Sequence, residues 1–144
     1  MIALGCDHGG YNLMCEIKAL LDEKRLAYRD FGTDSDKSVD YPDFAGPVAK
    51  AVAGGECELG ILVCGTGIGM SMAANKVRGI RAALCADCFS AEMTRRHNDA
   101  NILCLGARTT GAGLALKITD TFLETRFEGG RHARRVEKIM EMER

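Results

Sequence analysis

The sequence predicts an α/β fold in which helices cover both faces of a parallel sheet. Short apolar runs, too brief for helices, alternate along the chain with longer amphipathic stretches. Such runs are typical of strands buried on both faces, and each amphipathic stretch can form the right-handed crossover to a parallel neighbour. With 144 residues, 47% of them hydrophobic, the chain suits one domain, residues 1–144, around one core. We therefore expect a three-layer α/β/α sandwich with a five-stranded, parallel, Rossmann-like sheet and a C-terminal helix.

Each element follows from a local pattern. The expected strands are apolar runs bounded by glycine or polar residues, at 2–6, 27–31, 59–64, 81–85 and 102–105. The expected helices carry apolar residues at helical spacing, at 11–24, 44–53, 70–76, 90–96, 111–127 and 131 to the end. The long loop 32–43 contains TDSDKSVDYPD and is either plain surface or a flap over a site.

Composition and charge exclude several classes of protein. The 19 basic and 20 acidic residues give a formal net charge of −1, and no basic run marks a nucleic-acid or membrane surface, so we expect neither partner. The start MIALGCDHGG reaches Asp7 too early for a signal peptide, and no apolar run approaches a membrane-spanning length, which indicates a cytoplasmic protein. The seven cysteines are odd in number and lie in apolar segments, as reduced core residues do.

The segment LGILVCGTGIGMSMAAN, residues 59–75, ends an apolar strand in a cysteine, followed by three glycines at every second position and a helix. In a parallel sheet, ligands bind beyond the carboxyl ends of the strands, where the winding direction switches. That rule brings Cys6-Asp7-His8 to the same edge as residues 64–69. Glycines let a ligand approach the backbone, and amides at a helix start carry positive partial charge, so the loop suits an anionic group.

Nucleotide-binding motifs fit this loop poorly. A dinucleotide fingerprint needs G-x-G-x-x-G, whereas this loop has G-x-G-x-G after the third strand. A P-loop needs G-K-[ST], where this chain has Gly69-Met70-Ser71. A nucleotide-binding module and a ligand-free turn remain as alternatives.

Cys64 adds chemistry to the loop. A thiol beside a helix start and amide dipoles has its thiolate favoured, which gives a base or nucleophile near neutral pH. The same amides can hold an oxyanion, an arrangement that suits proton abstraction next to a carbonyl and formation of an enediolate. The alternative is that Cys64 is an inert, buried thiol.

Six segments along the chain carry a family pattern. They are GCDHGG at 5–10, DYPD at 40–43, CGTGIGMSMAANK at 64–76, GIRAAL at 79–84, RRHNDAN at 95–101 and EGGRHARRVEKI at 128–139. Their order and spacing resemble the type B ribose-5-phosphate isomerases and the related allose-6-phosphate and galactose-6-phosphate isomerases. The resemblance implies a small sugar phosphate as substrate and aldose–ketose interconversion through an enediolate, with no metal and no cofactor. It leaves open which sugar phosphate is physiological.

The resemblance also implies catalytic roles. Cys64 is the base that moves a proton between C2 and C1, and His97 helps to open the sugar ring. The anion hole is formed by Thr66 and by the backbone amides of Gly65, Gly67, Ile68 and Gly69. Some family members have serine at the Cys64 position and a glutamate base in the loop. Here Ile68 and Met70 supply no carboxylate, so Cys64 is the candidate base in this loop.

Residues near the first strand and in the long loop are candidate substrate contacts. Asp7 either caps a helix or binds sugar hydroxyls. His8 is expected near the ring oxygen or the phosphate, and Tyr41 either closes over the site or packs against the protein.

Basic residues near the C-terminus are candidate phosphate ligands. Arg131 and Arg135 lie four residues apart on one helical face, which is either solvated or a bidentate phosphate clamp; the resemblance favours the clamp. Arg108, after the fifth strand, is a third candidate, and Asn98 is a further substrate contact within RRHNDAN. His132 is expected at the surface.

The CADC segment, residues 85–88, supports a different hypothesis. C-x-x-C at a helix start is a thioredoxin-like redox motif, and also half of a zinc site. The sequence has no second such pair and no convincing histidine partner, so a zinc site is not expected. A thiol oxidoreductase remains an alternative in which Cys85 and Cys88 carry the function.

The predicted positions of Cys64 and His97 conflict within one chain. Cys64 ends a strand at the carboxyl edge of the sheet, whereas His97 precedes the fifth strand, at the amino edge. A five-residue strand spans roughly 16 Å, at about 3.3 Å per residue, so the two side chains should not meet. A two-fold partner would bring them together. We therefore expect an obligate homodimer with two shared sites, or a dimer of such dimers.

Overall fold

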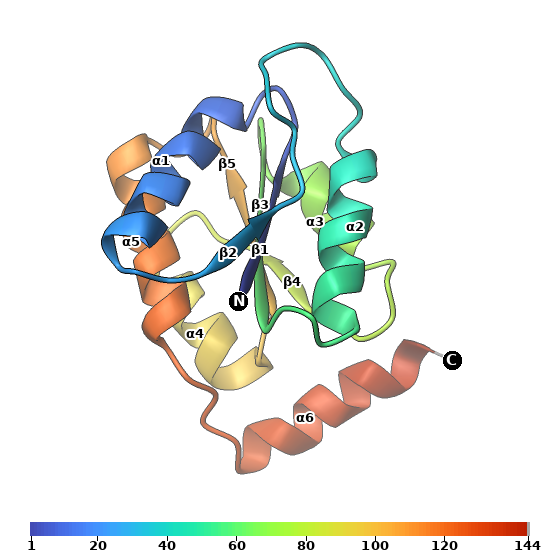
Figure 1. Ribbon diagram of the computed structural model, residues 1–144. Helices are drawn as coiled ribbons and strands as arrows, with labels where there is room; N and C mark the ends of the chain where they lie inside the picture. The colour runs from blue at the N-terminus through green and yellow to red at the C-terminus, as the bar shows by residue number, and fades with distance from the viewer. Residues whose placement is uncertain (144) are drawn as a thin grey trace.

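The computed structural model describes residues 1–143 (Figure 1). Within this range one parallel sheet has the strand order β2-β1-β3-β5-β4. The strands are β1 (Ile2–Cys6), β2 (Tyr28–Asp30), β3 (Leu59–Cys64), β4 (Ala82–Leu84) and β5 (Ile102–Gly106). The helices are α1 (Tyr11–Glu23), α2 (Pro42–Ala53), α3 (Ile68–Ala74), α4 (Cys88–Asn98), α5 (Ala112–Glu124) and α6 (Arg131–Met140), followed by a short 3₁₀ helix, Glu141–Glu143. In residues 1–143, no helix combines the length and apolar character that crossing a membrane requires.

The three-layer sandwich that the sequence predicts is confirmed. Helices α1, α4 and α5 cover one face of the sheet, and α2 and α3 cover the other (Figure 1). Successive strand residues point to opposite faces, so Ile61 and Val63 join the core under α1 and α5, while Leu62 and Cys64 join the core under α2 and α3. The central strands are apolar throughout because both of their faces are buried.

The predicted boundaries fail mainly at the sheet edges and helix ends. The edge strands β2 and β4 have three residues each, and all six of these residues remain partly or fully exposed. Helix α3 begins two residues before its predicted start because Gly67, with φ of +78°, serves as its N-cap. Helix α5 ends at Glu124, since Thr125 adopts an extended conformation. Apolar spacing alone carries none of this local backbone information.

The strand register defines the edge at which ligands bind. Cys6 lies opposite Val63 in the β1–β3 pair, and Cys64 lies opposite Gly106 in the β3–β5 pair, so the three central strands end together. The chain leaves β1 for β2 on one side of the sheet and leaves β3 for β4 on the other. This reversal between neighbouring strands is the topological switch point, where α/β proteins hold their ligands.

Helix α6 lies away from that edge. It crosses below the sheet at the amino ends of the strands, on the side opposite the long loop 32–43 (Figure 1). Contacts just before β4 hold it there: the Gly79 amide donates to Glu143 Oε1 at 2.8 Å, and Arg81 Nη1 lies 3.4 Å from Met140 Sδ. The glycines at 129 and 130, with φ of +70° and +59°, make the turn into the helix.

Candidate active site

The loop after β3 places a backbone amide against the sulfur of Cys64. The Gly67 amide donates to Cys64 Sγ at 3.1 Å, and the cysteine side chain is buried. A Cβ on Gly67 would lie 2.6 Å from Leu84 Cδ1 and 2.9 Å from the carbonyl carbon of Leu105, so this turn admits no side chain. A donated amide stabilises negative charge on sulfur, as a thiolate base requires.

The loop after β5 runs along the Cys64 loop and presents Arg108. The amides of Ala107 and Arg108 donate to the carbonyls of Cys64 and Gly65, each at 2.9 Å. The guanidinium lies over two glycines, because a Cβ on Gly65 would come within 3.4 Å of Arg108 Nη1 and one on Gly9 within 3.6 Å of Nη2. An exposed cation therefore borders the cysteine loop.

Asp7 reaches the same place from β1. Its amide donates to the Val63 carbonyl at 3.2 Å, and its buried carboxylate accepts from the Gly10 amide at 3.1 Å. Gly10, rather than Asp7, is the N-cap of α1, so the alternative in which Asp7 is the helix cap is wrong. A Cβ on Gly9 would lie 3.3 Å from the Gly65 amide nitrogen and 3.4 Å from Asp7 Oδ1. The carboxylate thus lies beside the cysteine loop.

The long loop 32–43 folds back onto this edge. The Val39 amide donates to His8 Nδ1 at 3.2 Å, which makes Nδ1 an acceptor and leaves Nε2 to carry the proton of neutral His8. The Tyr41 ring packs against Gly69, where a Cβ would lie 2.6 Å from the ring carbons Cε1 and Cζ. Of the two interpretations of this loop, these contacts favour a flap over the site.

Two amides of the cysteine loop already have partners within the loop. Besides the Gly67 amide, which donates to Cys64, the Ile68 amide donates to Thr66 Oγ1 at 3.2 Å. Thr66 and Ile68 are exposed. A bound anion would therefore share or displace these two contacts.

The other predicted site residues lie at the amino edge of the sheet. His97 and Asn98 are the last residues of α4, and the exposed Arg131 and Arg135 lie on α6. Figure 1 shows α6 and the end of α4 below the sheet, on the side opposite the long loop 32–43 that folds onto the Cys64 edge. Within one chain, the candidates around Cys64 thus lie at the carboxyl edge of the sheet, and these four lie at the amino edge.

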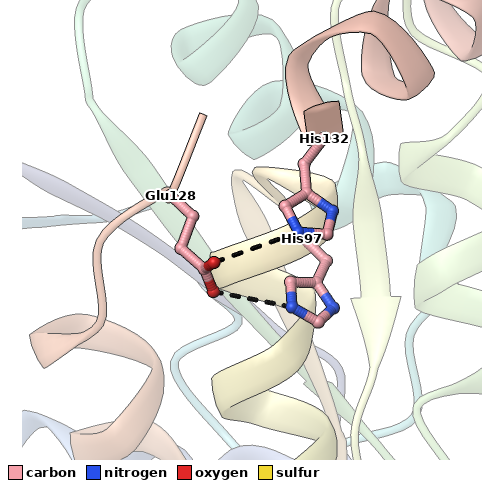
Figure 2. Close-up of side chains that lie close together, drawn as sticks. All are labelled: His97, Glu128 and His132. Atoms are coloured by element: carbon pink, nitrogen blue, oxygen red, sulfur yellow. Dashed lines mark ion pairs between the residues drawn. The ribbon is translucent and has the colours of Figure 1, made fainter. Parts of the chain in front are cut away.

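His132 is buried, so its predicted surface position is wrong. Its ring stacks on His97 with centroids 4.1 Å apart and planes 10° apart, because α6 folds back over α4. Glu128, which the sequence analysis did not single out, lies beside both rings (Figure 2). Its Oε2 is 3.5 Å from His97 Nε2, and its Oε1 is 3.9 Å from His132 Nε2. Burial, reinforced by the nearby charges of His97 and Arg131, lowers the pKa of His132.

The CADC cysteines lack the surroundings of a redox pair. Cys85 is buried, and burial, together with the charge of Asp87, raises the pKa of its thiol to about 11. A thioredoxin-like motif needs the opposite shift on its attacking thiol. Throughout the described residues the cysteines are free thiols, most of them buried, as expected.

Comparison with known proteins identifies one family. The family model described as Ribose/Galactose Isomerase matches residues 2–139. Ribose-5-phosphate isomerase B of Escherichia coli is 51% identical over 142 residues, covering 99% of this chain and 95% of the relative.

Solved structures agree over the same length. Ribose-5-phosphate isomerase B of Clostridium thermocellum superposes with a TM-score of 0.97 at 58% identity, covering 99% of this chain and 96% of the other. The Mycoplasma genitalium enzyme, solved with bound ribulose-5-phosphate, superposes with a TM-score of 0.94 at 44% identity, covering 99% and 95%. On its sequence and its fold alike, this chain belongs to the ribose/galactose isomerase family.

Proposed function

We propose that this protein is an aldose–ketose isomerase that interconverts ribose 5-phosphate and ribulose 5-phosphate without a metal or cofactor. The observation that carries the proposal is the 3.1 Å hydrogen bond from the Gly67 amide to Cys64 Sγ, at the switch point of the sheet and beside the buried Asp7 carboxylate. The Mycoplasma genitalium relative with bound ribulose-5-phosphate supports the choice of substrate.

The chemistry is a proton transfer between neighbouring carbons. The Cys64 thiolate removes the proton from C2 of the open-chain aldose, and the electron pair moves through the C1 carbonyl to give an enediolate. The amides of residues 65–69 and the Thr66 hydroxyl stabilise the charge on oxygen. The thiol then returns the proton to C1, while a proton moves between the two oxygens, which completes the ketose. Asp7 holds substrate hydroxyls, and Tyr41 closes over them.

A second copy of the chain completes the site in this proposal. His97 opens the sugar ring, and Arg131 and Arg135 bind the phosphate, but all three lie at the far edge of the chain that carries Cys64 (Figure 1). A two-fold partner would bring its own copies of these residues to Cys64 and so create two shared sites. Dimers could pair further into a dimer of dimers.

Exposed apolar residues near the cysteine loop support such an interface. Ile68, Met72 and Phe89 are 47%, 64% and 72% exposed, and they lie on α3 and at the start of α4. Leu84, 41% exposed, belongs to the same region, since its side chain borders the Gly67 turn. An apolar patch of this kind is typical of a protein interface.

The test compares three substrates of the purified protein: ribose 5-phosphate, allose 6-phosphate and galactose 6-phosphate. We expect the highest kcat/KM with ribose 5-phosphate, undiminished after prolonged treatment with a chelator. A preference for either hexose phosphate would redirect the proposal within the family. If the protein turned over none of the three and an adenine nucleotide raised its thermal stability, the nucleotide-binding alternative would replace the isomerase proposal.

A further inference from the structure

Two imidazoles and a carboxylate converge at the amino edge of the sheet (Figure 2). The donor atoms of His97, Glu128 and His132 all lie within 4.8 Å of one another. They come from three segments: the end of α4, the link 125–130 and the first turn of α6. Residues distant in sequence therefore bring three metal-ligating groups together.

This donor set suits a borderline divalent metal. Two histidines and one glutamate, with water in the fourth position, form a known type of open tetrahedral zinc site. At metal–ligand distances near 2.0–2.1 Å, tetrahedral donors lie about 3.3 Å apart. Glu128 Oε2 and His97 Nε2 are 3.5 Å apart, and Glu128 Oε1 and His132 Nε2 are 3.9 Å apart. Both distances slightly exceed this value, so the set closes around an ion only if side chains shift and turn.

We propose that His97, Glu128 and His132 bind Zn²⁺, or a divalent transition metal of similar preference, and that the bound ion inhibits the enzyme. The inhibitory part rests on the proposed function, because it follows from the ring-opening role of His97. An ion on the His97 imidazole occupies the nitrogen lone pair and restrains the ring. The site is thus inhibitory and takes no part in the isomerase chemistry.

The side chains that must move are the exposed ones. The rings are stacked 10° from parallel, so the His97 ring must turn until its lone pair points at the same ion as that of His132. His97 and Glu128 have side chains 39% and 46% exposed and can make this adjustment, whereas His132, 9% exposed, is the fixed member. Glu128 Oε2 also lies 3.9 Å from Arg96 Nη1, a loose ion pair that the metal would displace.

The binding test uses Co²⁺ with the purified full-length protein. Cobalt is chosen because its visible bands report coordination geometry, and thiolate ligands add a strong near-ultraviolet band. We expect one Co²⁺ per chain, without the thiolate band, displaced by Zn²⁺. Glu128→Gln should weaken binding by more than about tenfold, since even residues behind the ligands contribute that much. Glu124→Gln is the matched control. Glu124 lies four residues before Glu128 but pairs with Lys24, outside the cluster, so its variant should bind as wild type does.

The outcomes separate the metal site from the proposed function. No Co²⁺ binding, a thiolate band, or unchanged binding by both Glu128→Gln and His132→Gln overturns the metal site and leaves the isomerase proposal intact. Inhibition by Zn²⁺ that a chelator reverses, and that Glu128→Gln resists, supports the whole inference. Because Zn²⁺ also inhibits if it binds the Cys64 thiolate, the resistance of Glu128→Gln to Zn²⁺ is the required control. Binding through the cluster without loss of turnover overturns the inhibitory role, together with the ring-opening role of His97.

Discussion

The two edges of the sheet hold their functional groups in different ways. At the carboxyl edge, hydrogen bonds from backbone amides fix the residues around Cys64. The amides of residues 7, 107 and 108 donate to a neighbouring loop or strand, and the Gly67 amide donates to Cys64 within its own loop. At the amino edge the backbone is also hydrogen-bonded, since the Glu128 amide donates to the Arg96 carbonyl at 3.1 Å, but the side chains of His97, Glu128 and His132 are positioned by one another, and that of Glu128 is half exposed. The first edge is preorganised by the fold, whereas the second can adjust its side chains when a ligand or a second chain arrives.

This difference matches the chemistry proposed for each edge. A thiolate base and an anion hole need atoms placed to within a fraction of an ångström, which backbone contacts provide. Ring opening, phosphate binding and the proposed metal site use long or rotatable side chains, which tolerate adjustment. Substitutions at the two edges should therefore have separable effects.

The largest expected effect comes from Cys64→Ala. Removing the base should lower turnover by about 10²- to 10⁴-fold, the usual contribution of a general base, while the backbone frame keeps the fold intact. Steady-state kinetics with ribose 5-phosphate and thermal unfolding measure the two quantities. Cys88→Ala is the control and should keep wild-type turnover. The reverse pattern, with Cys88→Ala inactive and Cys64→Ala active, would favour the thiol oxidoreductase.

The other buried thiols make chemical modification selective in the same experiment. Burial raises the pKa of Cys6 to about 12 and that of Cys85 to about 11, so both stay protonated and unreactive at neutral pH. In a Cys15→Ser, Cys88→Ala background, which removes the exposed and the partly exposed thiol, an alkylating reagent should inactivate the enzyme by modifying Cys64. Bound substrate should protect against this loss.

The next effect in size tests how rigid the carboxyl edge is. Gly67→Ala introduces a Cβ at φ +78° and within 2.6 Å of Leu84 Cδ1, so it should destabilise the fold by about 1–3 kcal/mol and lower turnover. Gly113→Ala is the matched control, because no atom lies within 4 Å of the added Cβ. In helix α5 this change should stabilise the protein by about 0.5–1 kcal/mol. Chemical denaturation compares the two variants. Equal free energies of unfolding would mean that the turn relaxes and that the edge is not rigid.

The smallest signal tests whether the two edges work together. Cys64→Ala and His97→Asn, each nearly inactive alone, are refolded as a mixture. Random pairing makes half of the dimers mixed, with one intact and one doubly damaged site in each, so roughly a quarter of wild-type activity should return. Subunit exchange is verified separately with tagged chains. If exchange is efficient and no activity returns, Cys64 and His97 do not act together across an interface.

The fold was accessible from the sequence because its signals are local. Apolar runs placed β1 and β3 at their observed bounds, and strand–helix alternation indicated the parallel sheet and its carboxyl edge. The Cys64 loop could be recognised because its cysteine, glycines and helix are consecutive. The separation of Cys64 from His97 also followed, since in an alternating fold the end of a helix returns to the amino edge.

The tertiary structure alone decided which side chains meet. The burial of His132 against His97, with Glu128 beside both, depends on how α6 folds back over α4. The three residues are spread over 36 positions of sequence, and no local pattern predicts that they meet. The packing of Tyr41 on Gly69 and the bond from Val39 to His8 likewise depend on the path of a long loop. Periodicity reports which face of an element is apolar, whereas the position of one element against another is set by the packing of the whole core.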